Sequence, residues 1–139
     1  MAKVLIVDDE PSIRETLSEF VRETGHEAFA AADANEALEI VAQSRPDVVV
    51  CDIVLPGMDG TGLLERIRRI APDAQVIMVT GEPTVETAAD AVRQGAFDYL
   101  SKPVSRVEIQ ATVESALRVK WRDDERTRLE EERPVPRAP

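Results

Sequence analysis

The chain has 139 residues, of which 43% are hydrophobic and 32% are charged, a balance typical of a soluble globular domain. Its net charge of −10 argues against unaided binding to a phosphate backbone and favours a cation or a basic partner surface. A single cysteine, Cys51, excludes an intramolecular disulfide and a multi-cysteine metal cluster. No apolar stretch approaches the roughly 20 residues that span a bilayer, so we expect a cytoplasmic domain without a membrane anchor.

Five short apolar runs, rich in valine and isoleucine, alternate with amphipathic stretches along residues 3–117. Because the runs mostly lack polar alternation, they are typical of strands buried on both faces of a parallel sheet. The alternation predicts an α/β fold of the (βα)5 type, a doubly wound five-stranded parallel sheet with its functional groups at the carboxyl ends of the strands. The predicted strands span residues 3–7, 27–31, 47–51, 75–79 and 97–100.

The stretches between the runs carry apolar side chains at helical spacing, which predicts five amphipathic helices. Asp33 precedes the second predicted helix and Ser105 the last one, and both are expected to cap the helix that follows. His26 lies in a turn before the second strand, where we expect a solvated side chain. The predicted buried face of the fourth helix consists of small residues, which are Val85, Ala88, Ala89 and Val92.

The composition changes after Leu117. Residues 118–133 are highly charged and predict a continuation of the last helix, whereas residues 134–139 contain three prolines and predict a linker. We therefore divide the chain into a domain over residues 1–118 and an extension with linker over residues 119–139. Leu117, Trp121 and Leu129 could form an apolar seam along the extension, but the heptad pattern lapses after barely one turn, and the role of Trp121 stays open.

Charged and hydroxyl side chains follow four of the five predicted strands. Asp8 and Asp9 follow the first, Asp52 the third, Thr80 the fourth and Lys102 the fifth. Carboxylates that meet at one sheet edge repel each other, and a hard cation such as Mg²⁺ or Mn²⁺ relieves this repulsion. A carboxylate beside such a metal can attack phosphorus, while an ammonium and a hydroxyl bind the phosphoryl oxygens. These residues therefore predict metal-assisted phosphoryl transfer onto Asp52.

Four motifs at these strand ends together resemble the receiver domain of bacterial response regulators, over residues 3 to about 118. They are DD at 8–9, DIVLPGMDG at 52–60, TG at 80–81 and GAFDYLSKP at 95–103. Residues 81–103 are in addition similar to receivers of the nitrogen-regulator type, which precede an ATPase and a DNA-binding domain. The resemblance implies a phosphorylation-activated switch of a two-component phosphorelay.

The resemblance implies a role for each residue of the acceptor site. Asp52 is the phospho-acceptor and Lys102 holds a phosphoryl oxygen. Mg²⁺ is the cofactor, bound directly by Asp9, Asp52 and the backbone carbonyl of Val54, and by Asp8 through a water molecule.

The resemblance also implies a switch next to the acceptor. Thr80 binds the phosphoryl group and moves toward it, and Tyr99 rotates inward with it. The Lys102–Pro103 bond is expected to be cis, and Gly57 and Gly60 are expected to shape the loop after Asp52.

The implied partner is a sensor histidine kinase or a histidine phosphotransfer protein, and a phosphorylation-dependent homodimer is possible. These residues are not expected to bind nucleic acid or membrane, and the protein is not expected to be an enzyme with a turnover substrate. The charged extension and the prolines favour a part of a longer transcriptional regulator over a stand-alone receiver. The cognate kinase, the signal and the target genes stay open.

Two other functions remain as alternatives. A phosphatase of the haloacid-dehalogenase type also uses an aspartate nucleophile with Mg²⁺, but it needs a second aspartate two residues later, where this chain has Val54. A flavodoxin-like flavin carrier needs a phosphate-binding loop after the first strand, where the acidic residues 8–10 would repel a phosphate. No G-x-G-x-x-G motif supports a dinucleotide site.

Overall fold

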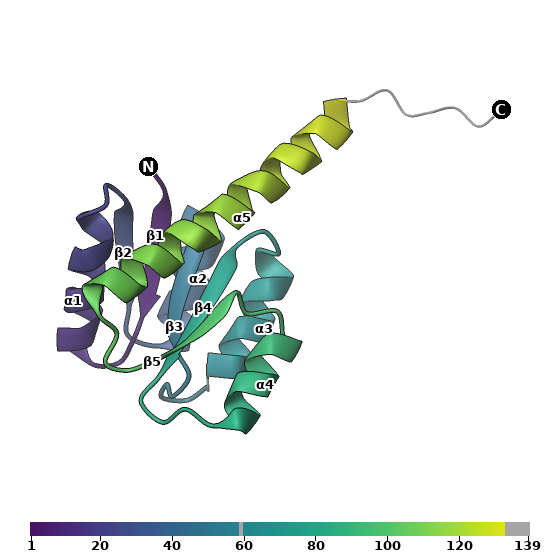
Figure 1. The fold of residues 1–139 in the computed structure, drawn as a ribbon. Helices are drawn as coiled ribbons and strands as arrows, with labels where there is room; N and C mark the ends of the chain where they lie inside the picture. Colours follow the sequence, from purple (N-terminus) through teal and green to yellow (C-terminus); the bar gives the residue numbers. More distant parts are fainter. Residues whose placement is uncertain (59, 133–139) are drawn as a thin grey trace.

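The computed structural model describes residues 1–58 and 60–132. Within them, strands and helices alternate along the chain, as the (βα)5 prediction requires (Figure 1). The strands are β1 (Lys3–Val7), β2 (Glu27–Ala31), β3 (Val48–Asp52), β4 (Gln75–Thr80) and β5 (Asp98–Ser101). The helices are α1 (Pro11–Arg22), α2 (Ala34–Ser44), α3 (Gly60–Ile70), α4 (Val85–Arg93) and α5 (Arg106–Glu132).

All strand pairs are parallel, and the sheet order is β2-β1-β3-β4-β5. The order reverses direction between β1 and β3, and this switch point opens a crevice at the carboxyl ends of the strands. The strand register aligns those ends, because Val7 pairs with Cys51, Asp52 with Val79, and Thr80 with Ser101. The residues that follow the strands therefore meet at one edge.

Apolar side chains fill both faces of the sheet. Along β1, Val4 and Ile6 face a cluster with α1 and α5, whereas Leu5 and Val7 face a cluster with α2, α3 and α4. Burial on both faces explains the nearly uninterrupted apolar runs and confirms the reading of a parallel sheet. The layers are visible in Figure 1, where α5 crosses one face of the sheet beside α1.

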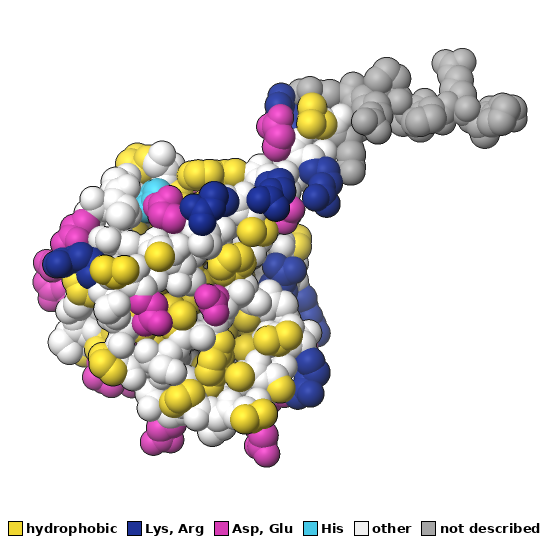
Figure 2. Space-filling view, viewed as in Figure 1, with side chains coloured by type: hydrophobic (Ala, Val, Ile, Leu, Met, Phe, Trp, Pro, Cys, Tyr) yellow, Lys and Arg dark blue, Asp and Glu magenta, His cyan; other side chains and the backbone are white. Residues whose placement is uncertain are grey.

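The predicted buried face of α4 is wrong. Val85 and Val92 are 87% and 71% exposed, and Ala91 is the residue of α4 that is fully buried. The small alanine side chain lets the helix approach the sheet edge at β5, and the valines then point outward. Figure 2 shows apolar side chains gathered on this side of the molecule, below α5.

His26 is buried rather than solvated. Its Nδ1 accepts a hydrogen bond from the backbone N–H of Ala2 at 3.2 Å, and its Nε2 lies 2.6 Å from Oε1 of Glu114 on α5. These partners are 24 and 88 residues away in the chain, so a reading of local sequence could not reveal them.

The last helix, α5, is the longest element. Ser105 precedes it and accepts the backbone N–H of Glu108 at 3.0 Å, which satisfies one donor of the first turn. The helix continues past Leu117 to Glu132 and projects beyond the sheet (Figure 1). Residues 133–139, which include the predicted linker, lie outside the described residues. Within the described part of the chain, no helix is both long and apolar enough to cross a membrane.

Candidate functional site

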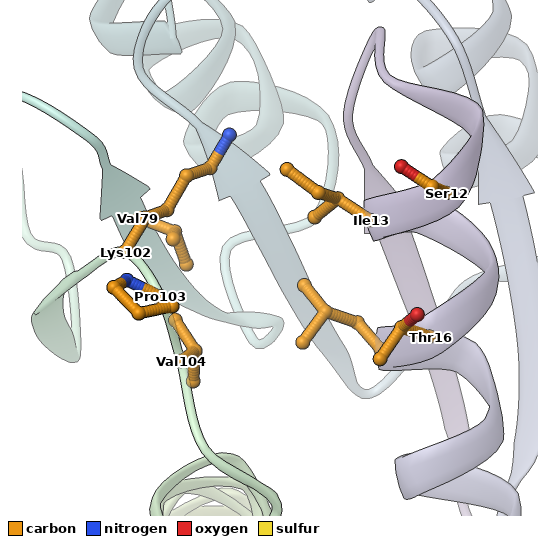
Figure 3. Close-up of a pocket in the computed structure, with 8 residues that line it drawn as sticks. Ser12, Ile13, Thr16, Val79, Lys102, Pro103 and Val104 are labelled. Carbon is orange, nitrogen blue, oxygen red and sulfur yellow. The ribbon is translucent and has the colours of Figure 1, made fainter.

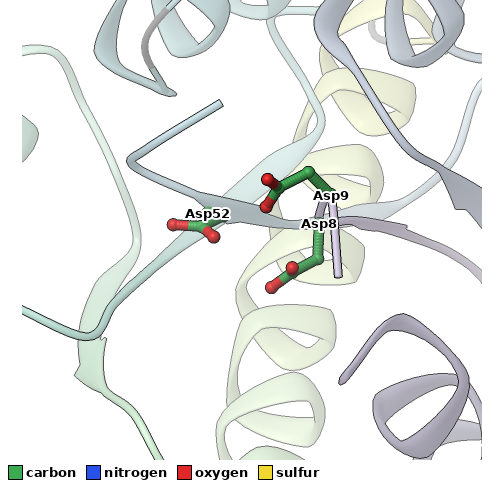
Figure 4. Close-up of side chains that lie close together, drawn as sticks. All are labelled: Asp8, Asp9 and Asp52. Carbon is green, nitrogen blue, oxygen red and sulfur yellow. The ribbon is translucent and has the colours of Figure 1, made fainter. Parts of the chain in front are cut away.

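Three carboxylates meet at the carboxyl edge of the sheet. Asp8 and Asp9 follow β1 and Asp52 ends β3, and one oxygen of each lies within 4.8 Å of the others (Figure 4). Asp8 and Asp52 are buried and Asp9 is exposed. The structure therefore brings together the three acidic residues that the sequence predicts to form a metal site.

Lys102 reaches this cluster from the loop after β5. Its Nζ lies 2.8 Å from Oδ2 of Asp52 and 2.9 Å from Oδ2 of Asp8. Burial opposes the charge on Lys102, but the hydrogen bonds and charges of Asp52 and Asp8 together outweigh burial and raise the pKa of the lysine. The ammonium offsets one of three negative charges, so ionised carboxylates leave a net charge of −2 that matches a divalent cation.

Backbone amides hold the other oxygens of the two buried carboxylates. The N–H of Val54 donates to Oδ1 of Asp52 at 3.0 Å, and the N–H of Glu10 donates to Oδ1 of Asp8 at 2.9 Å. Each buried carboxylate is thus fixed from one side by the backbone and from the other by Lys102. The two buried carboxylates are therefore held in place without any bound ligand.

The loop after Asp52 depends on two glycines, as the sequence predicts. Gly57 has φ +80°, a conformation that residues with a side chain rarely adopt. Gly60 donates to the carbonyl of Ile53 at 2.6 Å, and a Cβ at Gly60 would lie 2.3 Å from the carbonyl oxygen of Asp52. The close approach of α3 to the end of β3 therefore requires glycine at residue 60.

Cys51 precedes the candidate acceptor and does not line the acidic cavity. The residue is fully buried, and burial, followed by the charges of Asp52 and Asp8, raises the pKa of its thiol. The thiol stays protonated and donates to the carbonyl oxygen of Asp52 at 3.2 Å. Cys51 is the small buried side chain that its place in an apolar strand suggests.

Asp9 and Asp52 border a cavity of about 260 Å³. Glu10 and Glu82 also line it, although neither is among the predicted site residues. Glu10 follows Asp9 by one residue and Glu82 follows Thr80 by two, and this proximity in sequence is the feature that could have indicated their place at the cavity. The full lining comprises Asp9, Glu10, Asp52, Val54, Thr80, Gly81, Glu82 and Lys102.

The two predicted switch residues occupy different places. Thr80 is buried at the end of β4, lines the cavity, and accepts the backbone N–H of Glu82 with its hydroxyl at 3.1 Å. Tyr99 stays outside the acidic cluster, because its hydroxyl lies 2.5 Å from Oγ1 of Thr87 in the first turn of α4. Of the two residues predicted to form the switch, Thr80 therefore lies at the acidic cavity and Tyr99 at α4.

The Lys102–Pro103 peptide bond is cis, as expected. On the side of Lys102 toward α1 lies a second, largely apolar cavity of about 370 Å³ (Figure 3). Ser12, Ile13 and Thr16 of α1 form one wall of this cavity, and Val79, Pro103 and Val104 lie opposite them.

Comparison with known proteins agrees with this geometry. The response regulator receiver domain family matches residues 4–114. The DNA-binding transcriptional regulator NtrC of Azospirillum brasilense is 35% identical over 116 residues, which are 84% of this chain and 24% of NtrC. The nitrogen assimilation regulatory protein NtrX of Azorhizobium caulinodans is 38% identical over 116 residues, which are 82% of this chain and 26% of NtrX. The chain thus spans about a quarter of the length of these relatives.

Solved structures show the same likeness. The receiver domain of NtrX from Brucella abortus superposes with a TM-score of 0.79 at 37% identity, covering 83% of this chain and 98% of that domain. A longer NtrX structure from the same organism superposes with a TM-score of 0.89 at 33% identity, covering 99% of this chain and 31% of NtrX. The fold, the acidic site and these matches show that the chain belongs to the response regulator receiver domain family, the phosphorylation-dependent signalling domain of two-component systems, and that it is of the nitrogen-regulator type.

Proposed function

We propose that Asp52 accepts a phosphoryl group from a histidine kinase, a histidine phosphotransfer protein or a small donor such as acetyl phosphate. The observation that carries this proposal is the buried Asp52 carboxylate, held by Lys102 and the Val54 amide beside two further carboxylates. In the transfer, an oxygen of Asp52 forms the new bond to phosphorus. The bond from phosphorus to the donor breaks, and the donor keeps its electron pair. Lys102 then binds an oxygen of the transferred group.

The residues at the site fit Mg²⁺. Asp9 and Asp52 would supply carboxylate oxygens, the carbonyl of Val54 would complete the protein ligands, and Asp8 would act through a water molecule. All of these donors are oxygens, the type that Mg²⁺ prefers, and the net charge beside Lys102 suits a divalent ion. When bound, the ion supplies positive charge that offsets the repulsion between the carboxylates and the incoming phosphoryl oxygens.

Phosphorylation is proposed to shift a two-state equilibrium at the loop before α4, at α4 and at β5. The Thr80 hydroxyl accepts the N–H of Glu82, so its movement toward a phosphoryl group would release the loop that leads to α4. Tyr99 contacts the first turn of that helix through Thr87 and would respond to the same movement.

Thr80→Ala is expected to accept the phosphoryl group but to lose the structural response. Without the hydroxyl, the hydrogen bond that joins Thr80 to the N–H of Glu82 in the loop after β4 is lost. Hydrogen exchange of residues 81–93 measures this response before and after phosphorylation. Thr80→Ser keeps the hydroxyl and should respond as the wild-type protein does. A full response in Thr80→Ala would remove Thr80 from the switch.

The acyl phosphate is expected to be long-lived, because Val54 places a branched apolar side chain at the cavity and cannot orient an attacking water. Val54→Asn should speed hydrolysis about tenfold, which corresponds to about 1.4 kcal/mol of barrier. Loss of the phosphoryl mass over time gives the rate. Val54→Ala is the control, because it shortens the side chain without adding a polar group. An unchanged rate in Val54→Asn would contradict this role for Val54.

We infer that the protein catalyses only its own phosphorylation and dephosphorylation and has no turnover substrate. The position of Val54 supports this inference, since a dehalogenase-type phosphatase needs an acid there. Because NtrC and NtrX are about four times as long as the matched region, we further propose that the receiver controls an output carried by a longer regulator. A homodimer formed on phosphorylation and the absence of direct contact with DNA are parts of the same proposal.

The chemical class of the bond between the phosphoryl group and the protein tests the proposal. Protein incubated with acetyl phosphate and Mg²⁺ should gain one phosphoryl unit in intact mass. Treatment with hydroxylamine should remove it, because hydroxylamine cleaves acyl phosphates and spares phosphate esters. A hydroxylamine-resistant modification would rule out the proposed function, and the absence of any modification would rule out acetyl phosphate as a donor.

A further inference from the structure

A row of polar side chains runs along α5 beside its buried apolar stripe. Arg106, Gln110 and Glu114 are spaced by four residues, so they lie on one side of the helix. Their partners are all on α1 or in the turn that follows it. Arg106 Nε lies 2.9 Å from Oε2 of Glu23, Gln110 Nε2 donates to the carbonyl of Phe20 at 2.9 Å, and Glu114 contacts His26.

These contacts fix the position of α5 against α1. Nδ1 of His26 accepts the backbone N–H of Ala2, and Nε2 on the other side of the ring faces Glu114 of α5. The guanidinium of Arg106 also lies over the ring of Phe20, 5.0 Å from its centroid. A slide or rotation of α5 would break several of these contacts together. The contacts therefore hold α5 in one position against α1 and the sheet.

One more contact lies beyond the last buried turn. Lys120 follows Leu117 by three residues, yet its side chain is only 13% exposed. Its Nζ lies 3.7 Å from Oδ1 of Asp47 and 2.5 Å from Oδ2 of Asp124. Asp47 precedes β3, at the end of the sheet opposite to Asp52. Figure 2 shows Lys and Arg side chains gathered along this part of α5.

Asp47 is itself anchored to the sheet. Its Oδ2 accepts the backbone N–H of Lys3 at 2.9 Å, and its own N–H donates to the carbonyl of Lys3 at 2.8 Å. Its carbonyl accepts the N–H of Gln75 at 3.0 Å. The carboxylate that meets Lys120 therefore belongs to the rigid edge formed by β1, β3 and β4.

We propose that the contact between Asp47 and Lys120, which we name the clasp, fixes residues 118–132 of α5 as a rigid arm of the receiver. Isolated helices of this length are marginal in water, so the arm needs an attachment beyond the buried residues to stay helical and keep its direction. The arm then moves as a unit with the rest of the receiver domain and does not bend at Leu117. The further statement that it keeps its direction when Asp52 is phosphorylated rests on the proposed function.

Hydrogen exchange of the full chain tests the clasp without phosphorylation. Lys120→Met removes the charge and keeps the aliphatic chain, and amides of residues 118–129 should then exchange about fivefold faster. Arg118→Met is the matched control, because it removes the same charge two residues earlier in the helix. Arg118 is exposed and contacts Ser115 of the same helix. Asp47→Ala should act as Lys120→Met does, and the double variant should be no faster than either. Equal exchange in Lys120→Met and wild type, or equal acceleration in Arg118→Met, would overturn the clasp.

A distance measurement tests the direction of the arm. Nitroxide labels on Glu39→Cys in α2 and Arg126→Cys in α5 occupy exposed positions, and the buried Cys51 is protected from labelling. Pulsed electron resonance should give one narrow distance distribution that broadens in Lys120→Met. Acetyl phosphate should leave the distribution unchanged, while intact mass of the same sample shows whether phosphoryl uptake occurred. A broad distribution in the unphosphorylated labelled protein would overturn the rigid arm. A shifted distance distribution in a sample that carries the phosphoryl group would overturn the statement that the arm keeps its direction on phosphorylation. Absence of phosphoryl uptake would count against the proposed function alone.

Discussion

Lys102→Met is expected to lower the free energy of unfolding of the metal-free protein by about 3 kcal/mol. Lys102 contacts both Asp8 and Asp52, whose side chains are only 3% and 6% exposed. Removing the ammonium leaves two buried carboxylates without their shared counter-charge, and such a loss is among the costlier single changes. Urea denaturation without Mg²⁺ measures the difference.

Mg²⁺ should restore part of the stability lost in Lys102→Met, because a divalent cation compensates the same carboxylates. The control is Lys120→Met, the same substitution at a lysine whose partners are far from the site; its cost should stay below about 1 kcal/mol. Equal losses in the two variants would mean that Lys102 is an ordinary surface lysine.

Millimolar Mg²⁺ is expected to stabilise the wild-type protein strongly and the Asp52→Asn variant weakly. A ligand that binds only the folded state stabilises it by about 2.7 kcal/mol at 100 times its Kd. Asp52→Asn removes one of three crowded negative charges, so the metal-free variant should be about 1 kcal/mol more stable than wild type. Thermal melts across a Mg²⁺ series, with Ca²⁺-free buffer and EDTA as the zero point, give both numbers.

A melting temperature that does not respond to Mg²⁺ would contradict the metal site at Asp9 and Asp52. Asp33→Asn serves as the matched control, because Asp33 is a carboxylate that caps α2 through the N–H of Glu36 and lies outside the cluster. It should keep the full Mg²⁺ response. Loss of the response in both variants would show a nonspecific charge effect.

The sheet was predictable because its signal is local and repeated. The predicted bounds of β1 and β2 match the structure, and those of β3, β4 and β5 differ from it by one residue at one or both ends. Apolar runs without polar alternation reflect burial on both faces, and both faces are covered by helices. Parallel pairing then places the residues after each strand at one edge, so the sequence alone groups Asp8, Asp52 and Lys102.

What the sequence could not predict depends on contacts between distant segments. The apolar spacing of α4 suggests Val85 and Val92 as the buried face, but the helix lies at the sheet edge and buries Ala91. His26 and Asp47 look like turn residues, yet each meets α5 through a partner more than 70 residues away. At the site, the pattern identified the carboxylates but not the amides of Glu10 and Val54 that orient them.

The most direct test of the central claim is the intact mass of wild type and Asp52→Asn after incubation with acetyl phosphate and Mg²⁺. Asp52 is the carboxylate that both Lys102 and the Val54 amide hold at the cavity. We expect one added phosphoryl unit on the wild-type protein and none on Asp52→Asn, while Asp33→Asn is labelled as the wild type is. Equal labelling of Asp52→Asn would contradict Asp52 as the acceptor.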